Sequence, residues 1–143
     1  LTPSEIARWE ELHAKNADLQ SIGHEIDKVI AGLGEHKVKK ERFFDEQGEK
    51  ELLEAYARIA DDLKTALDYL SADDPVKREA AHKKLLATRK TLNDNELALV
   101  QSHMDRVSRG DFKAIETSAL HIALINRFRR LRTKINELAE LSF

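Results

Sequence analysis

The fold is decided by the stretch that begins Ile115-Glu116-Thr117-Ser118-Ala119-Leu120-His121-Ile122-Ala123-Leu124 and runs on to Phe143. Its apolar residues recur at intervals of four, three, four and three positions, and they are Leu124, Phe128, Leu131, Ile135 and Leu138. This spacing draws one apolar stripe along a helix. The basic residues between the apolar positions are Arg127, Arg129, Arg130, Arg132 and Lys134. We therefore predict a helix that has one packing face and one basic face.

A first long helix is predicted from about residue 3 to residue 39. It begins at Thr2-Pro3-Ser4-Glu5, where threonine and glutamate match a capping box and proline occupies the first turn. Its expected buried face alternates at four and three positions and comprises Leu12, Asn16, Leu19, Gly23, Ile26, Ile30 and Leu33. Because Asn16 and Gly23 lie one heptad apart on this face, we predict a close helix crossing there. The alternative is that the asparagine only fixes the helix register.

Two further helices precede the C-terminal one. The second is predicted from about residue 48 to 71, after Asp45 as a cap, and its seam is Leu52, Tyr56, Ile59, Leu63, Ala66 and Leu70. The third begins at Asp74-Pro75 and ends at Gly110, before Asp111 caps the last helix. Its leucines repeat every seven residues, but the seam positions between them are polar: Thr88, Asn95 and Ser102. Buried polar groups of this kind need hydrogen-bond partners.

The expected fold class is all-α, a single domain over residues 1–143 built as an antiparallel bundle of about four long helices. Charged residues make up 35% of the 143 and aromatic residues 6%, which favours charged helices over a sheet. The net charge of −2 implies no bulk attraction to nucleic acid. Since the basic cluster also lacks interleaved aromatic residues, no nucleic-acid partner is expected. The absence of cysteine excludes disulfides, thiolate metal sites and cysteine nucleophiles.

No catalytic motif is present in the sequence. It lacks a glycine-rich phosphate loop, a nucleophile elbow and a His-Glu-x-x-His pair, and none of its six histidines lies four residues from another. We therefore expect no enzymatic activity and no cofactor.

No window is apolar enough to span a membrane, and the N-terminus lacks a signal-peptide pattern. Because the chain begins at Leu1 rather than methionine, we expect it to belong to a longer protein whose membrane portion lies outside this sequence.

Three segments resemble one known family. The run from Ile115 to Ile125, followed by Arg129-Arg130-Leu131, resembles the last helix of the PhoU-like domain at the C-terminus of bacterial sodium/phosphate cotransporters. Asn16-Ala17-Asp18-Leu19-Gln20-Ser21-Ile22-Gly23-His24 is similar to another signature of that family. Phe44-Asp45-Glu46-Gln47-Gly48, followed by Glu51-Leu52, resembles the linker between its two helical repeats. The resemblance implies that residues 1–42 end a first repeat and that residues 43–143 form a second, three-helix repeat.

The resemblance also implies a function. It predicts a non-enzymatic, PhoU-like regulatory domain at the cytoplasmic face of the inner membrane, which docks on the transmembrane sodium/phosphate transport domain of the same or a partner chain. The residues expected to contact the partner or an anion are Glu116, Thr117, Ser118, His121, Arg127, Arg130 and Lys134. The alternative for the basic residues is a solvated face paired with acidic neighbours. The first helix should expose an apolar stripe, and we expect a homodimer to cover it.

This chain differs from the family at the positions that bind metal. The family binds metal clusters through a Glu/Asp-x-x-x-Asp pair, because hard cations need convergent carboxylate oxygens. Here that pair is Gln20 and His24, and Arg127 stands where the last helix of the family has an acidic residue. We therefore expect no bound metal. Two alternatives stay open: a metal sensor that uses Gln20, His24 and His121, and a helical protein-binding scaffold without a connection to phosphate.

Overall fold

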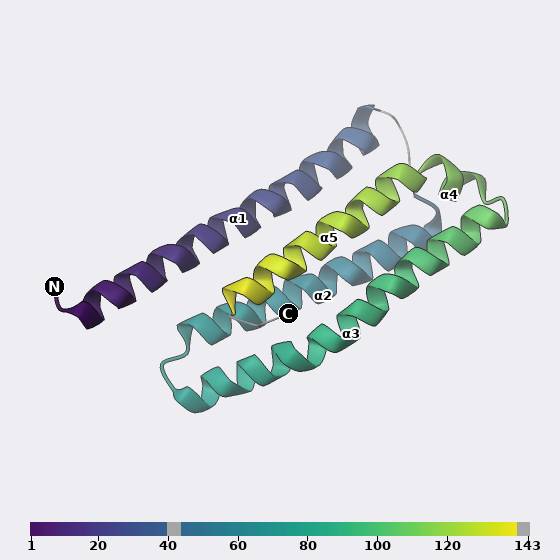
Figure 1. Cartoon of the computed structure of the whole chain (residues 1–143). Helices are drawn as coiled ribbons and strands as arrows, with labels where there is room; N and C mark the ends of the chain where they lie inside the picture. Colours follow the sequence, from purple (N-terminus) through teal and green to yellow (C-terminus); the bar gives the residue numbers. More distant parts are fainter. Residues whose placement is uncertain (40–43, 140–143) are drawn as a thin grey trace.

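The computed structural model describes residues 1–39 and 44–139, and the side chains of 1–32 and 44–139. This part of the chain contains helices and no strand, which confirms the all-α fold class (Figure 1). The helices are α1 (Pro3–Lys39), α2 (Glu46–Ser71), α3 (Pro75–Ser108), α4 (Phe112–Glu116) and α5 (Ser118–Leu138). The predicted bounds of the first three helices agree with these to within about two residues, because turn and cap residues mark their ends.

Side-chain caps define most of the helix starts. The Glu5 amide donates a hydrogen bond to the Thr2 hydroxyl at 3.2 Å, and the Thr2 amide donates to the Glu5 carboxylate at 2.7 Å, which completes the predicted capping box. The carboxylates of three aspartates accept bonds from the first turns of α2, α3 and α4, and these residues are Asp45, Asp74 and Asp111. Each cap satisfies an amide that has no partner inside its helix.

The C-terminal segment contains a break that the sequence pattern did not predict. Thr117 has φ −99° and ψ 6°, which separates the short helix α4 from α5. Its hydroxyl donates to the Lys113 carbonyl at 2.7 Å, and this local bond competes with the regular helical pattern. The prediction of one continuous helix was therefore wrong here, and the described part of the chain has five helices rather than about four.

Helix α5 occupies the centre of the arrangement. It packs against α2 and α3 on one side and against α1 on the other, while α2 and α3 also pack against each other (Figure 1). The whole predicted stripe of α5 is buried and forms the middle of the core: Leu124, Phe128, Leu131, Ile135 and Leu138. The α2 and α3 seams supply the facing residues, with Leu52, Ile59, Leu85 and Leu99 in the same cluster.

The buried face of α1 differs from the predicted one. Ile22 and Val29, which are 2% and 1% exposed, face α5, whereas Leu12 and Ile30 are 52% and 58% exposed. Asn16 and Gly23 are also exposed, and a Cβ atom built on Gly23 would meet no atom within 4 Å. The predicted helix crossing at Asn16 and Gly23 is therefore not made among the residues that the structure describes. Leu33, the last predicted seam residue, lies outside the residues whose side chains are described.

The cause is that α1 carries two apolar faces. One face holds Ile22 and Val29 and packs on α5. The other is the heptad alternation that continues around the helix surface through Leu12 and Ile30. Because α1 packs mainly on one helix, only one of its two faces is buried in the core. The periodic pattern correctly identified an apolar face but could not indicate which neighbour covers it.

The central position of α5 predicts a large effect from truncating its stripe. Leu131 is 1% exposed, so Leu131→Ala should lower the free energy of unfolding by about 2–5 kcal/mol. The matched control is Leu97→Ala on α3, because Leu97 is 71% exposed and its truncation should change stability by less than about 0.5 kcal/mol. Urea unfolding followed by circular dichroism measures both. Equal effects of the two substitutions would contradict the core assigned to α5.

Candidate functional site

A buried polar cluster lies where the start of α2, the end of α3 and the start of α5 meet. We call it the histidine–arginine cluster, and it consists of Asp45, Glu51, Ser102, His103, Arg106, Ser118 and His121. Asp45 is positioned as the cap of α2, and Glu51 follows in the second turn of that helix. Helix α3 contributes its last two turns, and α5 contributes its first turn. Three helix ends are therefore joined by polar side chains.

Arg106 is the centre of the cluster. Its Nε lies 2.8 Å from a carboxylate oxygen of Asp45, and its Nη1 lies 3.2 Å from a carboxylate oxygen of Glu51. Nη1 also donates to the Ser102 hydroxyl at 2.8 Å, and that hydroxyl donates to Glu51 at 2.6 Å. The side chains of Arg106 and Asp45 are only 7% and 8% exposed. A buried guanidinium needs such partners because an isolated charge in the interior is strongly unfavourable.

Two histidine rings stack beside the guanidinium. His103 and His121 are fully buried, their ring centroids lie 4.2 Å apart, and their planes differ by 11°. Nε2 of His103 shares a hydrogen bond of 2.9 Å with the Ser118 hydroxyl. The ring of Phe44 meets His121 edge to face, with centroids 5.9 Å apart. The stack therefore fixes the first turn of α5 against the end of α3 and the start of α2.

The environment keeps both histidines neutral at neutral pH. Burial lowers the pKa of His121 to about 4; the neighbouring His103 and Arg106 lower it as well, while Asp45 and Glu51 act in the opposite direction. Burial and then Arg106 likewise lower the pKa of His103. Burial raises the pKa of Glu51, but hydrogen bonds from Ser102 and Gln47 and the charge of Arg106 outweigh it, so the pKa is lowered. Glu51 is therefore an anion beside the Arg106 cation and the two neutral histidines.

The residues predicted for partner contact at the start of α5 divide between interior and surface. Thr117 is 3% exposed and His121 is 0% exposed, so the expectation of surface contact does not hold for these two side chains. Ser118 is half-buried and bonds His103. Glu116 is exposed on α4. The apolar periodicity predicted that this segment is helical, but it could not show that the side chain of His121 points into the bundle.

The basic face of α5 is shared between α1 and solvent. Nη1 of Arg127 lies 3.7 Å from a carboxylate oxygen of Glu25, and Nζ of Lys134 donates to the Ser21 hydroxyl at 2.5 Å. Both partners belong to α1. Arg130 is exposed. Of the three basic residues predicted to contact an anion or partner, two therefore help to hold α1 on α5, which favours the alternative of a paired face for them.

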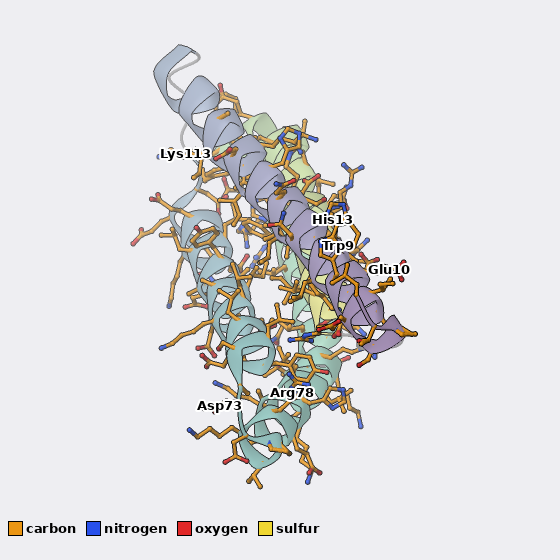
Figure 2. The ribbon with its side chains drawn as sticks, turned by 90° about the vertical axis from the view of Figure 1, so that its left-hand side faces the viewer. Trp9, Glu10, His13, Asp73, Arg78 and Lys113 are labelled. Carbon is orange, nitrogen blue, oxygen red and sulfur yellow. The ribbon has the colours of Figure 1, made fainter. Side chains whose placement is uncertain are left out.

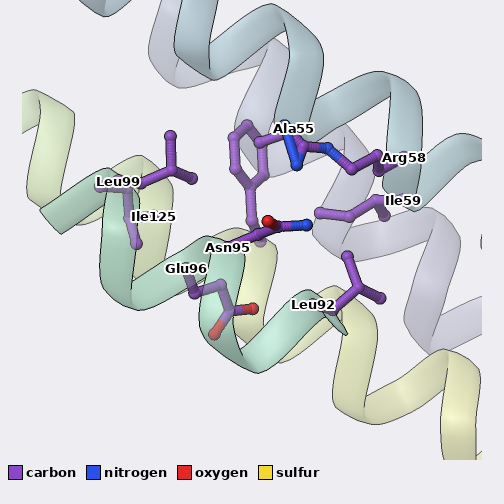
Figure 3. A pocket seen from close by; sticks show the side chains of 9 residues that line it. Ala55, Arg58, Ile59, Leu92, Asn95, Glu96, Leu99 and Ile125 are labelled. Carbon is purple, nitrogen blue, oxygen red and sulfur yellow. The ribbon is translucent and has the colours of Figure 1, made fainter. Parts of the chain in front are cut away.

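A second set of ion pairs joins α5 to α3. Arg129 and Arg132 approach the same Glu96 carboxylate oxygen at 3.2 Å and 3.3 Å. Glu96 lines a small crevice between α2 and α3 together with Arg58 and Asn95 (Figure 3). The crevice is mostly apolar, with Ile125 and Phe128 of α5 among its lining residues. These ion pairs therefore connect two cations of the basic face to α3.

The residues predicted for the alternative function of a metal sensor do not lie close together. Gln20 and His24 are exposed on α1, whereas His121 lies inside the bundle. Among the described side chains, those of residues 1–32 and 44–139, no group of three or more histidine, aspartate or glutamate residues could hold a metal ion. The separation of these residues follows from the orientation of α1, whose Gln20 and His24 lie away from the face that packs on α5.

Sequence reasoning missed Arg106, the most informative residue of the cluster. Its signal is present in the heptad of α3, because the seven-residue repeat of Leu85, Leu92 and Leu99 continues to Arg106. A cation at a core position predicts buried carboxylates near it. Asp45 was interpreted only as a cap, although the same carboxylate oxygen that caps α2 also contacts the guanidinium.

Comparison with known proteins gives a distant relationship. No family model matches the chain, and no solved structure matches it. The chain is 24% identical over 137 residues to a Salmonella typhimurium protein named "Putative inorganic phosphate export protein YjbB", and 23% identical over 137 residues to the Escherichia coli K12 protein of the same name. Each alignment covers 93% of this chain and 24% of the relative, so the chain spans about a quarter of the length of these relatives. In the described part of the chain, no helix is long and apolar enough to cross a membrane.

The histidine stack predicts a loss of stability in mild acid. Because the pKa of His121 falls from 6.5 to about 4 on folding, its contribution is present above pH 6.5 and is lost as the pH falls toward 4. We expect the free energy of unfolding to drop by about 2 kcal/mol between pH 7.5 and pH 5 from this residue alone. Urea unfolding across that range measures it, and His121→Phe should flatten the curve. His24→Gln, at an exposed histidine, is the control and should leave it unchanged.

The tight packing around Gly48 predicts the sign of two glycine substitutions. A Cβ atom at Gly48 would lie 2.6 Å from Asp45 Oδ1 and 3.3 Å from Arg106 Nη2, so Gly48→Ala should disturb the ion pair and destabilise the chain by about 1–3 kcal/mol. Gly32→Ala is the matched control in α1, where a Cβ atom would meet nothing within 4 Å. It should stabilise the helix by about 1 kcal/mol. A stabilising Gly48→Ala would contradict the geometry of the cluster.

Proposed function

We propose that this chain is a non-enzymatic regulatory domain of a phosphate-transport protein. The observation that carries the proposal is the similarity along 93% of the chain to proteins named for inorganic phosphate export. The resemblance of three sequence segments to the PhoU-like domain of sodium/phosphate cotransporters is independent of the helix packing and supports the same context. The domain lies at the cytoplasmic face of the inner membrane and acts by docking on the transmembrane transport part of the same or a partner chain.

The packing of the helices supports the division into repeats. Helices α2, α3 and α5 each contact the other two, whereas α1 packs mainly on α5. A three-helix unit over residues 43–143, preceded by a helix from another unit, is the arrangement that the PhoU-like resemblance implies. The chain therefore combines one self-contained bundle with a helix that has room for further neighbours.

The chemistry of the side chains supports docking as the mechanism. In the histidine–arginine cluster, Arg106 is paired with Asp45 and Glu51 and both histidines are buried, which favours a structural role for these groups over turnover of a substrate. The exposed candidates for contact with a partner or with a phosphate group are Glu116 and Arg130. Arg130 suits this role because a guanidinium can form paired hydrogen bonds to phosphate or carboxylate oxygens.

The test is phosphate flux in cells that carry the gene with or without the codons for residues 1–143. We expect the deletion to change the flux, or its response to external phosphate, because the domain biases the transport part. Arg130→Glu should shift the flux in the same direction, and Lys77→Glu, an exposed charge reversal in the first turn of α3, should leave it unchanged. Identical flux and identical phosphate response in the deletion strain would refute the regulatory function.

A further inference from the structure

Asp62 on α2 is a buried carboxylate without an ion pair. The buried acidic residues among those that the structure describes are Glu25, Asp45 and Asp62, and each is 6% exposed. Glu25 is paired with Arg127 at 3.7 Å, and Asp45 is paired with a guanidinium nitrogen at 2.8 Å. Asp62 forms no ion pair with any described residue. Since a buried acidic group is seldom left without a cation, Asp62 lacks a partner that the other two have.

The groups around Asp62 compensate its charge only in part. Burial raises the pKa of this carboxyl, a hydrogen bond from Thr88 lowers it by less, and neighbouring charges change it less again, so that the pKa stays raised. These charges are Asp61, Lys84 and Arg132. Thr88 has a single hydroxyl proton, and the carbonyl of Leu85 accepts it at 3.0 Å. Asp62 therefore shares its hydrogen-bond donor with a backbone carbonyl.

Asp62 lines a groove that runs between α2 and α3. The groove has a volume of about 470 Å³, which lies in the range of small-molecule sites. In Figure 2 the turn between these helices is marked by Asp73 and Arg78, and the groove lies between this turn and the end of the bundle marked by Lys113. The side chains that leave the groove open are small: Ala57, Ala87, Thr88 and Thr91. Asp62 therefore borders a space of small-molecule size.

Arg58 and Asn95 lie where this groove meets the crevice shown in Figure 3. Arg58 precedes Asp62 by four residues, so the two positions are about 6 Å apart along the axis of α2. The guanidinium lies 3.9 Å from the carboxylate of Glu54, and because both side chains are more than a third exposed, water screens this pair. Asn95 forms no hydrogen bond with a described residue. The groove therefore offers an anion and a weakly paired cation one helical turn apart.

We propose that the groove binds a small zwitterion, whose protonated amine faces Asp62 and whose carboxylate or other anionic group faces Arg58. The amine supplies the cation that Asp62 lacks. The anionic group accepts the paired hydrogen bonds that a guanidinium can donate. Asn95, whose amide can both donate and accept, adds a contact to either charge. The ligand class is an amino acid with a short carbon chain between its charges. This site is separate from Arg130 on α5, to which the proposed function assigns partner contact.

Nuclear magnetic resonance titration with three matched compounds tests the site. γ-Aminobutyrate carries both charges, butylamine only the amine, and butyrate only the carboxylate. We expect γ-aminobutyrate to shift the amide signals of residues 57–62 and 87–95 and to bind at least tenfold more tightly than butylamine, because it engages both charged side chains. Butyrate should not bind. Butylamine or butyrate that binds as tightly as γ-aminobutyrate would overturn the proposal, and so would the absence of any shift at high millimolar concentration.

Substitutions assign the two charges. Asp62→Asn should weaken the binding of γ-aminobutyrate at least tenfold, and Arg58→Gln should reduce it to the level of butylamine. Asp68→Asn, at an exposed acidic residue of α2 outside the groove, is the matched control and should leave binding unchanged. Circular dichroism verifies that each variant is folded.

Stability without ligand separates a binding role of Asp62 from a structural one. Asp62→Asn should raise the urea midpoint of unfolding, because the substitution keeps the shape of the side chain and removes a buried charge that has no partner. A carboxylate that held the fold together would lower the midpoint when it is replaced. A lower midpoint, or an unchanged affinity for γ-aminobutyrate in this variant, would overturn the proposal. None of these results bears on the phosphate-flux test.

Discussion

The buried guanidinium of Arg106 is the constraint on which the end of the bundle depends. A cation at this position is tolerated only because Asp45 and Glu51 approach it from α2 at 2.8 Å and 3.2 Å. Asp45 is held in place by its second task, the cap of α2, and Gly48 must lack a side chain so that the carboxylate fits. Burial, together with this positive charge, lowers the pKa of both adjacent histidines and keeps their stack neutral. Cap, ion pair and stack therefore form one unit that fixes the relative position of α2, α3 and α5.

Much of the fold was predictable because its determinants are local. The stripe of α5, the seam of α2 and the aspartate caps each depend on residues within a turn or two of each other. The break at Thr117 was not predictable from apolar spacing, since it arises from one hydroxyl that bonds a carbonyl four residues back. The face of α1 was not predictable for a different reason. Two apolar faces satisfy the same periodicity, and the helix that covers one of them, α5, lies far away in sequence.

The candidate site, too, was predictable only where residues close in sequence determine it. Asp45 and His121 were each visible in the sequence, but they belong to segments about 75 residues apart, and the seven-residue repeat that reaches Arg106 was interpreted only as far as its leucines. For the basic face, the sequence predicted a cluster of cations without the acidic and hydroxyl partners that α1 and α3 provide. Glu25, Ser21 and Glu96 take up four of these cations. Arg130 is the exposed cation of the predicted contact set, which concentrates the functional proposal on one side chain.

Helix α1 is restrained less than the other long helices. Helix α1 is held to α5 by one apolar line and by partly exposed contacts such as Arg127 with Glu25, and contacts of this kind contribute little to stability. The three-helix unit, in contrast, is fixed by the core and by the histidine–arginine cluster. Helix α1 is therefore the least restrained of the long helices in the described part of the chain. Its Ser21 and Glu25 contact Lys134 and Arg127, so a displacement of α1 would remove the partners of these two cations on α5. The charge of the α5 face that carries Arg130 therefore depends on how α1 is packed.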